Sequence, residues 1–371
     1  MPKNTFNTKP FTGNIQNILN IISQCLENNR LTNNGPQVAT LNQNIKDYLD
    51  IKNFSLFCNG TIALLTGLKG LKLKGEVITT PYTFPATVHA IQWAGLTPVF
   101  CDIDEDSMCI DPNKIEPLIT DKTSAILGLH AYGMPCNIGK IERLANKHQL
   151  KIIYDAAHAF ITRIDGKSIA EFGHISIFSF HATKLLNTIE GGGLAYNDPN
   201  LTDTFNLMKN FGIRNQEEVV LSGINGKMNE IQAIVGIENL QSLGQEISRR
   251  EKLFTFYTNQ LAGIQGLKLL EFPKNTTNSL QYYPIRIDQQ LTGLTRDEVY
   301  AALAEQNIFA RKYFYPICSN YPCYSHLPSA HKTLLPVANK ISNEILCLPF
   351  YGELEDSRAQ QICNIVKASF N

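Results

Sequence analysis

The sequence has no excess of either charge and no run of basic residues. Its 371 residues include 33 lysines and arginines against 33 aspartates and glutamates, for a formal net charge of +0. Proteins that bind nucleic acid or an anionic membrane surface usually carry a basic patch or stripe. We therefore expect neither nucleic acid nor a membrane as a partner.

Long hydrophobic runs are also missing. The longest apolar stretches have the length of a β-strand, whereas a membrane-spanning helix needs about 20 apolar residues. The N-terminal segment MPKNTFNTKPFTGN is polar and lacks the apolar centre of a signal peptide. These absences favour a cytoplasmic protein.

The nine cysteines follow no spacing that is typical of a zinc site or a disulfide framework. Their number is odd, no C-x-x-C pair occurs, and no group of Cys and His has the spacing of zinc ligands. Scattered cysteines of this kind are typical of small core residues in a reducing compartment. We expect no metal.

Short apolar runs alternate with helix-like segments through the first two thirds of the chain. Strand-like runs are expected at residues 54–58, 76–80, 98–102, 124–130, 151–154 and 174–180. This alternation predicts an α/β fold with a doubly wound, mostly parallel sheet. Beyond Gly244 the pattern changes to two strands with two helices. We predict a large domain at 1–244, with an N-terminal helical segment, and a smaller α+β domain at 245–371.

Two of the predicted strands end on reactive side chains. The run 151–154 ends on Asp155, and the run 174–180 is followed by His181, Ala182, Thr183 and Lys184. In open α/β sheets, ligands bind outside the carboxyl ends of the strands. An acid that faces a ring nitrogen and a Schiff-base lysine are the minimum for pyridoxal phosphate chemistry. Taken alone, Asp155 could instead be a helix cap and Lys184 a surface lysine.

The segment Asn59-Gly60-Thr61 joins a predicted strand to an apolar helix at 62–71. This geometry directs backbone N–H groups and the positive end of the helix dipole at an anion. The spacing is neither that of a Walker loop nor that of a dinucleotide fingerprint. Without further support, an ordinary helix cap remains the alternative.

Taken together, the motifs resemble the DegT/DnrJ/StrS-type sugar aminotransferases, over nearly the whole chain. The matching blocks are Asn59-Gly60-Thr61, Pro81-Tyr82-Thr83-Phe84, Tyr154-Asp155-Ala156-Ala157-His158, Phe178 to Lys184 with Glu190-Gly191-Gly192, and Gly223 to Ala233. The resemblance implies the fold type I aminotransferase architecture, with pyridoxal 5'-phosphate as cofactor. It also implies a homodimer with composite active sites.

The resemblance assigns Lys184 and Asp155 as catalytic residues. Lys184 would bind the cofactor covalently and then carry a proton between the substrate carbon and the cofactor. Because it must spend time as a free amine, we expect its pKa to be lowered. Asp155 would pair with the pyridine nitrogen, and His158 would bond the cofactor's phenolic oxygen.

The remaining cofactor contacts are also implied by the resemblance. Gly60, Thr61 and the Ser179 hydroxyl would hold the phosphate. Asn225 would reach the phosphate from the partner subunit. Phe84 would stack on the cofactor ring, although a core aromatic is the alternative for this residue.

Substrate contacts are expected from the segment 311–316, which resembles a loop near the nucleotide-sugar site. Cations there suit a pyrophosphate and aromatic rings suit a sugar or base. Lys312 and Tyr313 are the candidates from this segment, and His181 is a third candidate.

The motifs look most like those of enzymes that aminate C4 of dTDP-4-keto-6-deoxy-D-glucose with L-glutamate as amino donor. A C3 aminotransferase on a dTDP-3-keto-6-deoxyhexose, or a C4 enzyme that gives the galacto epimer, is the alternative. A non-catalytic sugar-nucleotide or pyridoxal phosphate-binding regulator is a third possibility. The dehydratase branch of the family, which has histidine at the lysine position, is disfavoured because Lys184 is present.

Overall fold

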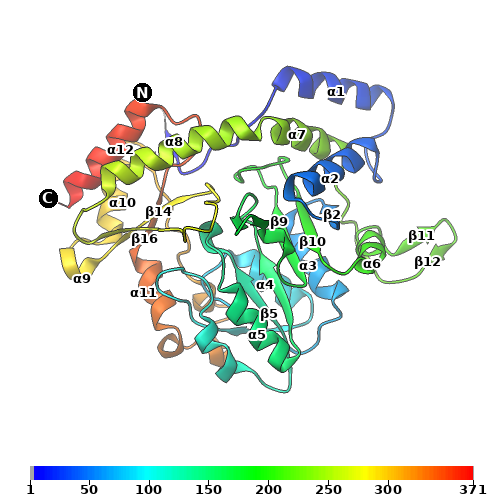
Figure 1. The fold of residues 1–371 in the computed structure, drawn as a ribbon, viewed down its shortest axis with the longest axis horizontal. Helices are drawn as coiled ribbons and strands as arrows, with labels where there is room; N and C mark the ends of the chain where they lie inside the picture. Colours follow the sequence, from blue (N-terminus) through cyan, green and yellow to red (C-terminus); the bar gives the residue numbers. More distant parts are fainter. Residues whose placement is uncertain (1–3, 371) are drawn as a thin grey trace.

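The computed structural model describes residues 4–370, so the first three residues of the predicted large domain and the last residue of the small one lie outside it. Its centre is a seven-stranded sheet in the order β2-β10-β9-β6-β5-β3-β4 (Figure 1). The strands are β2 (Phe54–Phe57), β3 (Glu76–Thr79), β4 (Thr97–Phe100), β5 (Thr123–Leu129), β6 (Lys151–Asp155), β9 (Ile175–Ser179) and β10 (Gly192–Tyr196).

The sheet is parallel from β9 through β6, β5 and β3 to β4, whereas β10 runs antiparallel to both of its neighbours. Parallel neighbours need a long crossover, usually a helix. The connection from β9 to β10 contains no helix, so the chain turns back beside β9. This connection, residues 180–191, carries Lys184.

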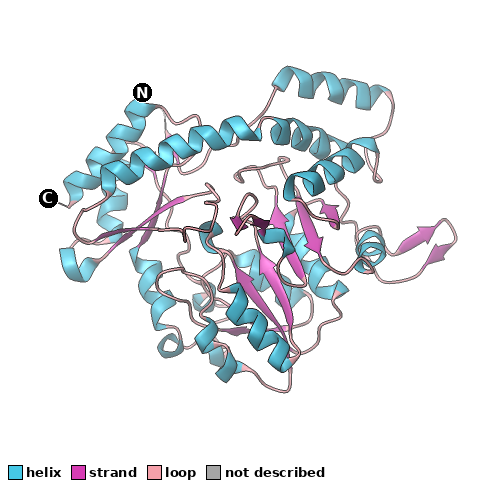
Figure 2. Cartoon of the chain, viewed as in Figure 1, coloured by secondary structure: helices cyan, strands magenta, loops and turns pink. Residues whose placement is uncertain are grey.

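Helices cover both faces of the sheet, as the doubly wound prediction requires (Figure 2). On one face, α3 (Gly60–Gly70), α4 (Pro85–Trp93) and α6 (Leu201–Met208) pack on Val77, Leu127 and Ile153. On the other face, α2 (Pro36–Leu49) and α5 (Ile138–His148) pack on the alternate strand residues. Each central strand therefore buries both of its faces, which explains its nearly continuous apolar sequence.

A second, three-stranded antiparallel sheet forms from the C-terminal part of the chain. It contains β13 (Leu267–Leu269), β14 (Tyr283–Ile287) and β16 (Ile345–Leu348). Packed around it are α8 (Leu243–Leu261), α10 (Arg296–Glu305), α11 (Pro336–Glu344) and α12 (Asp356–Ser369). The N-terminal strand β1 (Thr5–Phe6) pairs with β15 (Ile308–Phe309), so the start of the chain contacts this part of the molecule.

Two elements project from the body, and two helices run between its parts. Helix α1 (Ile15–Glu27) and the hairpin of β11 (Ile213–Asn215) and β12 (Glu218–Val219) extend from the body (Figure 1). Helix α7 (Glu230–Gln241) leads into α8, which crosses the molecule. The small elements that complete the chain are the two-stranded β7 (Arg163–Ile164) and β8 (Lys167–Ser168) and the short helix α9 (Gln289–Thr292).

The connection between β4 and β5 contains no α-helix among the described residues. The segment around 111–119 forms two 3-10 turns, Pro112–Lys114 and Glu116–Leu118, instead of an α-helix. Pro117 lacks the backbone N–H that an α-helix would use at this position, which explains the break. Among residues 4–370, no helix combines the length and the apolar character that crossing a membrane requires.

Candidate active site

A cavity of about 500 Å³ opens at the carboxyl ends of β6 and β9. It gathers nine of the residues that the sequence singles out: Gly60, Thr61, Phe84, Asp155, His158, Ser179, His181, Lys184 and Tyr313. These residues come from segments up to 253 positions apart in the chain, between Gly60 and Tyr313. The topology therefore brings most of the candidate site residues to one place.

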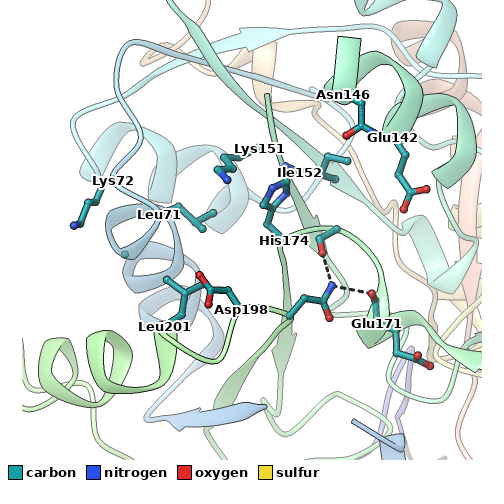
Figure 3. Close-up of a pocket in the computed structure, with 13 residues that line it drawn as sticks. Leu71, Lys72, Glu142, Asn146, Lys151, Ile152, Glu171, His174, Asp198 and Leu201 are labelled. Atoms are coloured by element: carbon teal, nitrogen blue, oxygen red, sulfur yellow. Dashed lines mark hydrogen bonds between the residues drawn. The ribbon is translucent and has the colours of Figure 1, made fainter. Parts of the chain in front are cut away.

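A second cavity lies at the opposite, amino-terminal end of β6 and is different in character (Figure 3). Its lining mixes the cations Lys72 and Lys151 with the acids Glu142, Glu171 and Asp198. The lysines here are exposed, whereas the first cavity holds the buried carboxylate of Asp155 and the half-buried Lys184. We therefore take the cavity at the carboxyl ends as the candidate active site.

Asp155, the last residue of β6, is only 5% exposed. Its Oδ2 accepts a hydrogen bond from the Thr87 hydroxyl at 2.8 Å, and its Oδ1 accepts one from the Ala157 N–H at 3.0 Å. Burial raises the pKa of the Asp155 carboxyl, and these hydrogen bonds and the charge of Lys184 oppose that rise. These two hydrogen bonds hold the carboxylate in one orientation. It lines the cavity, where it can pair with a cation or an N–H group of a bound ligand.

Lys184 lies in the helix-free connection between β9 and β10. Burial lowers the pKa of its amine from 10.5 to about 8; the charge of Asp155 opposes the shift and that of Arg311 adds to it. The Nζ atom lies 5.9 Å from the centre of the Tyr282 ring. A lysine with this pKa exists partly as the free amine near neutral pH, as a nucleophile or a base requires.

The N-terminus of α3 forms one wall of the cavity. The Asn59 side chain accepts from the Ile62 N–H at 2.8 Å, and the Asn59 carbonyl accepts from the Ala63 N–H at 3.1 Å. The N–H groups of Gly60 and Thr61 have no acceptor among the described residues. A helix N-terminus with free N–H groups favours an anion.

Ser179 completes this wall from the end of β9. A Cβ built on Gly60 would lie 3.0 Å from the Ser179 Cβ and 3.3 Å from its Oγ, so only glycine leaves the gap open. Two free N–H groups and a hydroxyl around an open gap are a donor set that fits a phosphate. With Asp155 and Lys184 across the cavity, the residues present fit pyridoxal phosphate.

His158 follows Asp155 by three residues and is buried among aromatic rings. Its Nδ1 accepts from the Tyr132 N–H at 3.3 Å, so the neutral ring carries its proton on Nε2. Burial, together with the positive charges of Lys184 and Arg311, lowers the pKa of the His158 ring well below its usual value. His158 is therefore a neutral donor.

Other predicted residues lie at the rim of the cavity or outside it. Phe84 is 44% exposed, with its ring 6.2 Å from that of Tyr313. The His181 Nδ1 bonds the Thr183 hydroxyl at 2.9 Å. Lys312 does not line the cavity; its Nζ pairs with Asp297 at 2.7 Å. Asn225 is exposed and does not line this protomer's cavity; its side-chain oxygen accepts from the Lys227 amine at 3.0 Å.

The sequence reasoning missed two residues of the site. Arg311 lines the cavity, with its guanidinium 4.1 Å from the centre of the Tyr313 ring and no acidic partner among the described residues. Thr87 orients Asp155. Arg311 belongs to a segment that the resemblance had marked, so its charge could have identified it. Nothing in the sequence connects Thr87 with Asp155, because the contact depends on how α4 packs.

The chain matches known proteins over nearly its whole length. The model of the DegT/DnrJ/EryC1/StrS aminotransferase family matches residues 14–367. The chain is 40% identical to a dTDP-4-amino-4,6-dideoxy-D-glucose transaminase of Escherichia coli, with 97% of each chain covered. It is 37% identical to a Shigella dysenteriae enzyme of the same name, with 99% of each covered.

The fold also matches solved structures. The crystal structure of DesI in the presence of its TDP-sugar product superposes with a TM-score of 0.94 at 30% identity. That match covers 99% of this chain and 93% of DesI. The fold class predicted from the sequence is therefore confirmed. The chain belongs to the DegT/DnrJ/EryC1/StrS aminotransferase family, whose members depend on pyridoxal phosphate.

Proposed function

We propose that this protein transfers the amino group of L-glutamate to C4 of dTDP-4-keto-6-deoxy-D-glucose, giving dTDP-4-amino-4,6-dideoxy-D-glucose. The observation that carries the proposal is a buried acid and a lysine of lowered pKa in one cavity, in a chain 40% identical to a transaminase of that name. We also propose a cytoplasmic location, which the unpaired thiols of the nine cysteines support.

Lys184 is proposed as the catalytic base and acid. Bound pyridoxal phosphate supplies an electron sink for the pair left when the substrate C–H bond breaks. Lys184, with a pKa of about 8, would move a proton from the glutamate carbon to the cofactor in the first half-reaction and from the cofactor to C4 of the sugar in the second.

Asp155 and His158 are proposed to hold the cofactor's polar edge. The Asp155 carboxylate, fixed by Thr87 and Ala157, keeps the ring nitrogen protonated. His158, with its proton on Nε2, donates to the phenolic oxygen. Phe84 would cover one face of the ring. Together these contacts would orient the cofactor ring and keep the positive charge on its nitrogen.

The phosphate is proposed to lie at the N-terminus of α3. The free N–H groups of Gly60 and Thr61 and the Ser179 hydroxyl are the donors within one protomer. Asn225 is proposed to complete this set from the partner subunit of a homodimer. Its exposure, and its absence from the lining of its own protomer's cavity, support that role.

Arg311 and Tyr313 are proposed as contacts for the anionic substrates, with His181 at the rim. The Arg311 guanidinium has no acidic partner among the described residues, so it is free for a carboxylate or pyrophosphate. Lys312 is less suited to this role than the resemblance implied, because its amine is paired with Asp297.

The proposal is tested by following the cofactor and the product together. The purified protein should absorb in the visible range, lose that absorbance when L-glutamate is added, and regain it when dTDP-4-keto-6-deoxy-D-glucose follows. A small panel of dTDP- and UDP-linked keto-sugars, with the aminated carbon assigned by NMR, decides the substrate. If the enzyme aminated C3, or preferred a UDP-sugar, the proposed reaction would be wrong and another reaction of the same family would take its place.

A further inference from the structure

The carboxamide of Gln281 holds the backbone on both sides of Lys184. Gln281 Oε1 accepts from the Leu185 N–H at 2.8 Å, and Gln281 Nε2 donates to the Thr183 carbonyl at 2.9 Å. The Gln281 side chain is only 2% exposed. One side chain from the C-terminal part of the chain therefore bonds both peptide groups that flank the lysine.

Gln281 is itself fixed by its neighbours. The preceding residue, Leu280, has a positive φ of 53°, and its carbonyl accepts from Arg250 of α8 at 3.0 Å. Arg250 in turn forms a buried ion pair with Glu246 at 2.6 Å. The Ser279 hydroxyl donates to the Tyr132 carbonyl at 2.7 Å. The segment 279–281 is thus fastened to α8 and to the loop at Tyr132.

The same segment contacts other parts of the candidate site. Tyr132 donates its N–H to the Nδ1 of His158, and the Tyr282 ring lies 5.9 Å from Lys184 Nζ. The loop 180–191 lacks helical hydrogen bonds of its own around the lysine, apart from the Lys184 N–H to the His181 carbonyl at 2.8 Å. Other side chains hold the later part of this loop, at Asn187 and Glu190, whereas Gln281 bonds the peptide groups next to the lysine.

We propose that Gln281 is a positioning residue for Lys184: its two hydrogen bonds set the backbone from which the amine reaches the reacting carbon. This proposal rests on the proposed function of Lys184. Gln281 does not line the cavity among the described residues, so it acts through the lysine. A displacement of about 1 Å at a reacting group can cost about 100-fold in rate, whereas substrate affinity depends on other contacts.

Two substitutions separate the hydrogen bonds from side-chain volume. Gln281→Met keeps the length and bulk of the side chain and removes both hydrogen bonds. Gln281→Glu keeps the acceptor for Leu185 and loses the donor to Thr183. The matched control is Asn53→Ala, which removes a side-chain amide that donates to the Tyr196 carbonyl at 3.2 Å, away from the cavity.

For Gln281→Met we expect kcat to fall by about 10- to 100-fold, while KM for both substrates stays within about threefold. The second readout needs no turnover. Apo protein is mixed with pyridoxal phosphate and reduced with borohydride, and the labelled peptide is quantified by mass spectrometry. Labelling at Lys184 should be at least about tenfold slower in Gln281→Met than in wild type and unchanged in Asn53→Ala.

For Gln281→Glu, the pH profile adds a third readout. A carboxylate next to the loop should raise the pKa of Lys184. The rise of kcat with pH, expected near pH 8 in wild type, should therefore move to higher pH. Should Gln281→Met not fold, as judged by circular dichroism, Gln281→Glu decides by the same kinetic and labelling readouts. The proposal would be overturned if a folded Gln281 variant had a kcat and a labelling rate within twofold of those of Asn53→Ala.

Failure of the two proposals can be told apart. If wild-type protein does not transaminate but labels at Lys184, the proposed function fails and the labelling rates still judge Gln281. If wild type transaminates and the Gln281 variants match the control in rate and labelling, only the positioning role fails.

Discussion

At the scale of single residues, the proposed chemistry depends on the protonation of Lys184. Burial lowers the pKa of this amine to about 8, so it is mostly charged below that pH and mostly free above it. A step that needs the free amine should therefore rise with pH and level off above about pH 9. The measurement is the pH dependence of the reaction between the aminated cofactor form and the keto-sugar. A limb centred near pH 10.5, the ordinary lysine value, would contradict the assignment.

Arg311 offers a second test at this scale. Replacing Arg311 by glutamine removes a cation from the cavity, so we expect KM for the anionic substrates to rise by about 10- to 100-fold. The pKa of Lys184 should also rise, because Arg311 helps to lower it. Steady-state kinetics and the pH profile measure both effects. Arg143→Gln, an exposed arginine on α5, is the control and should change neither.

Much of the candidate site could be predicted from residues that are close in sequence. Asp155 and His158 fall in one short block, and Lys184 follows a strand end, so local patterns and the family resemblance identify them. Thr87 and Gln281 could not be predicted in this way. Each acts through a hydrogen bond to a segment 68 or about 96 residues away, and a single sequence does not record such tertiary contacts.

At the scale of elements, the N-terminus of α3 is the part whose role is easiest to test. Gly60→Ala would put a methyl group against Ser179 and close the gap between them. We expect the affinity for pyridoxal phosphate to fall by about tenfold or more while the fold is kept, since alanine favours a helix.

The control for this test is another helical glycine. A Cβ on Gly244, in the first turn of α8, would meet nothing within 4 Å. Gly244→Ala should therefore bind the cofactor as wild type does in an equilibrium titration of apo protein. Equal affinities in the two variants would show that the phosphate does not lie at α3.

Helices and strands could be predicted where the apolar periodicity was strong. The prediction was incomplete where the chain departed from that pattern. The central parallel strands are buried on both faces and read as apolar runs. Strand β10 is antiparallel to its neighbours because a loop without a helix precedes it. The apolar sequence of β10 alone does not reveal this direction. The predicted boundary near Gly244 stays a prediction; α8 begins at Leu243 and continues unbroken through that position.

At the scale of the whole molecule, the proposed composite site predicts that two inactivated variants complement each other. If Asn225 serves the partner's site, a dimer of one Lys184→Ala chain and one Asn225→Ala chain has one site with both defects and one intact site. Mixing the two inactive proteins under conditions that exchange subunits should restore about a quarter of wild-type activity. No recovery, with subunit exchange verified by mass spectrometry, would mean that Asn225 acts within its own chain.

The most direct test of the central claim follows the nitrogen itself. L-glutamate labelled with a nitrogen isotope is incubated with the protein and dTDP-4-keto-6-deoxy-D-glucose, and the dTDP-sugar is examined by NMR. We predict that the label appears on C4 in the gluco configuration with wild-type protein, and that it is absent with Lys184→Ala. Label on C4 at the wild-type rate with Lys184→Ala, or no label on the sugar with wild-type protein, would contradict the claim.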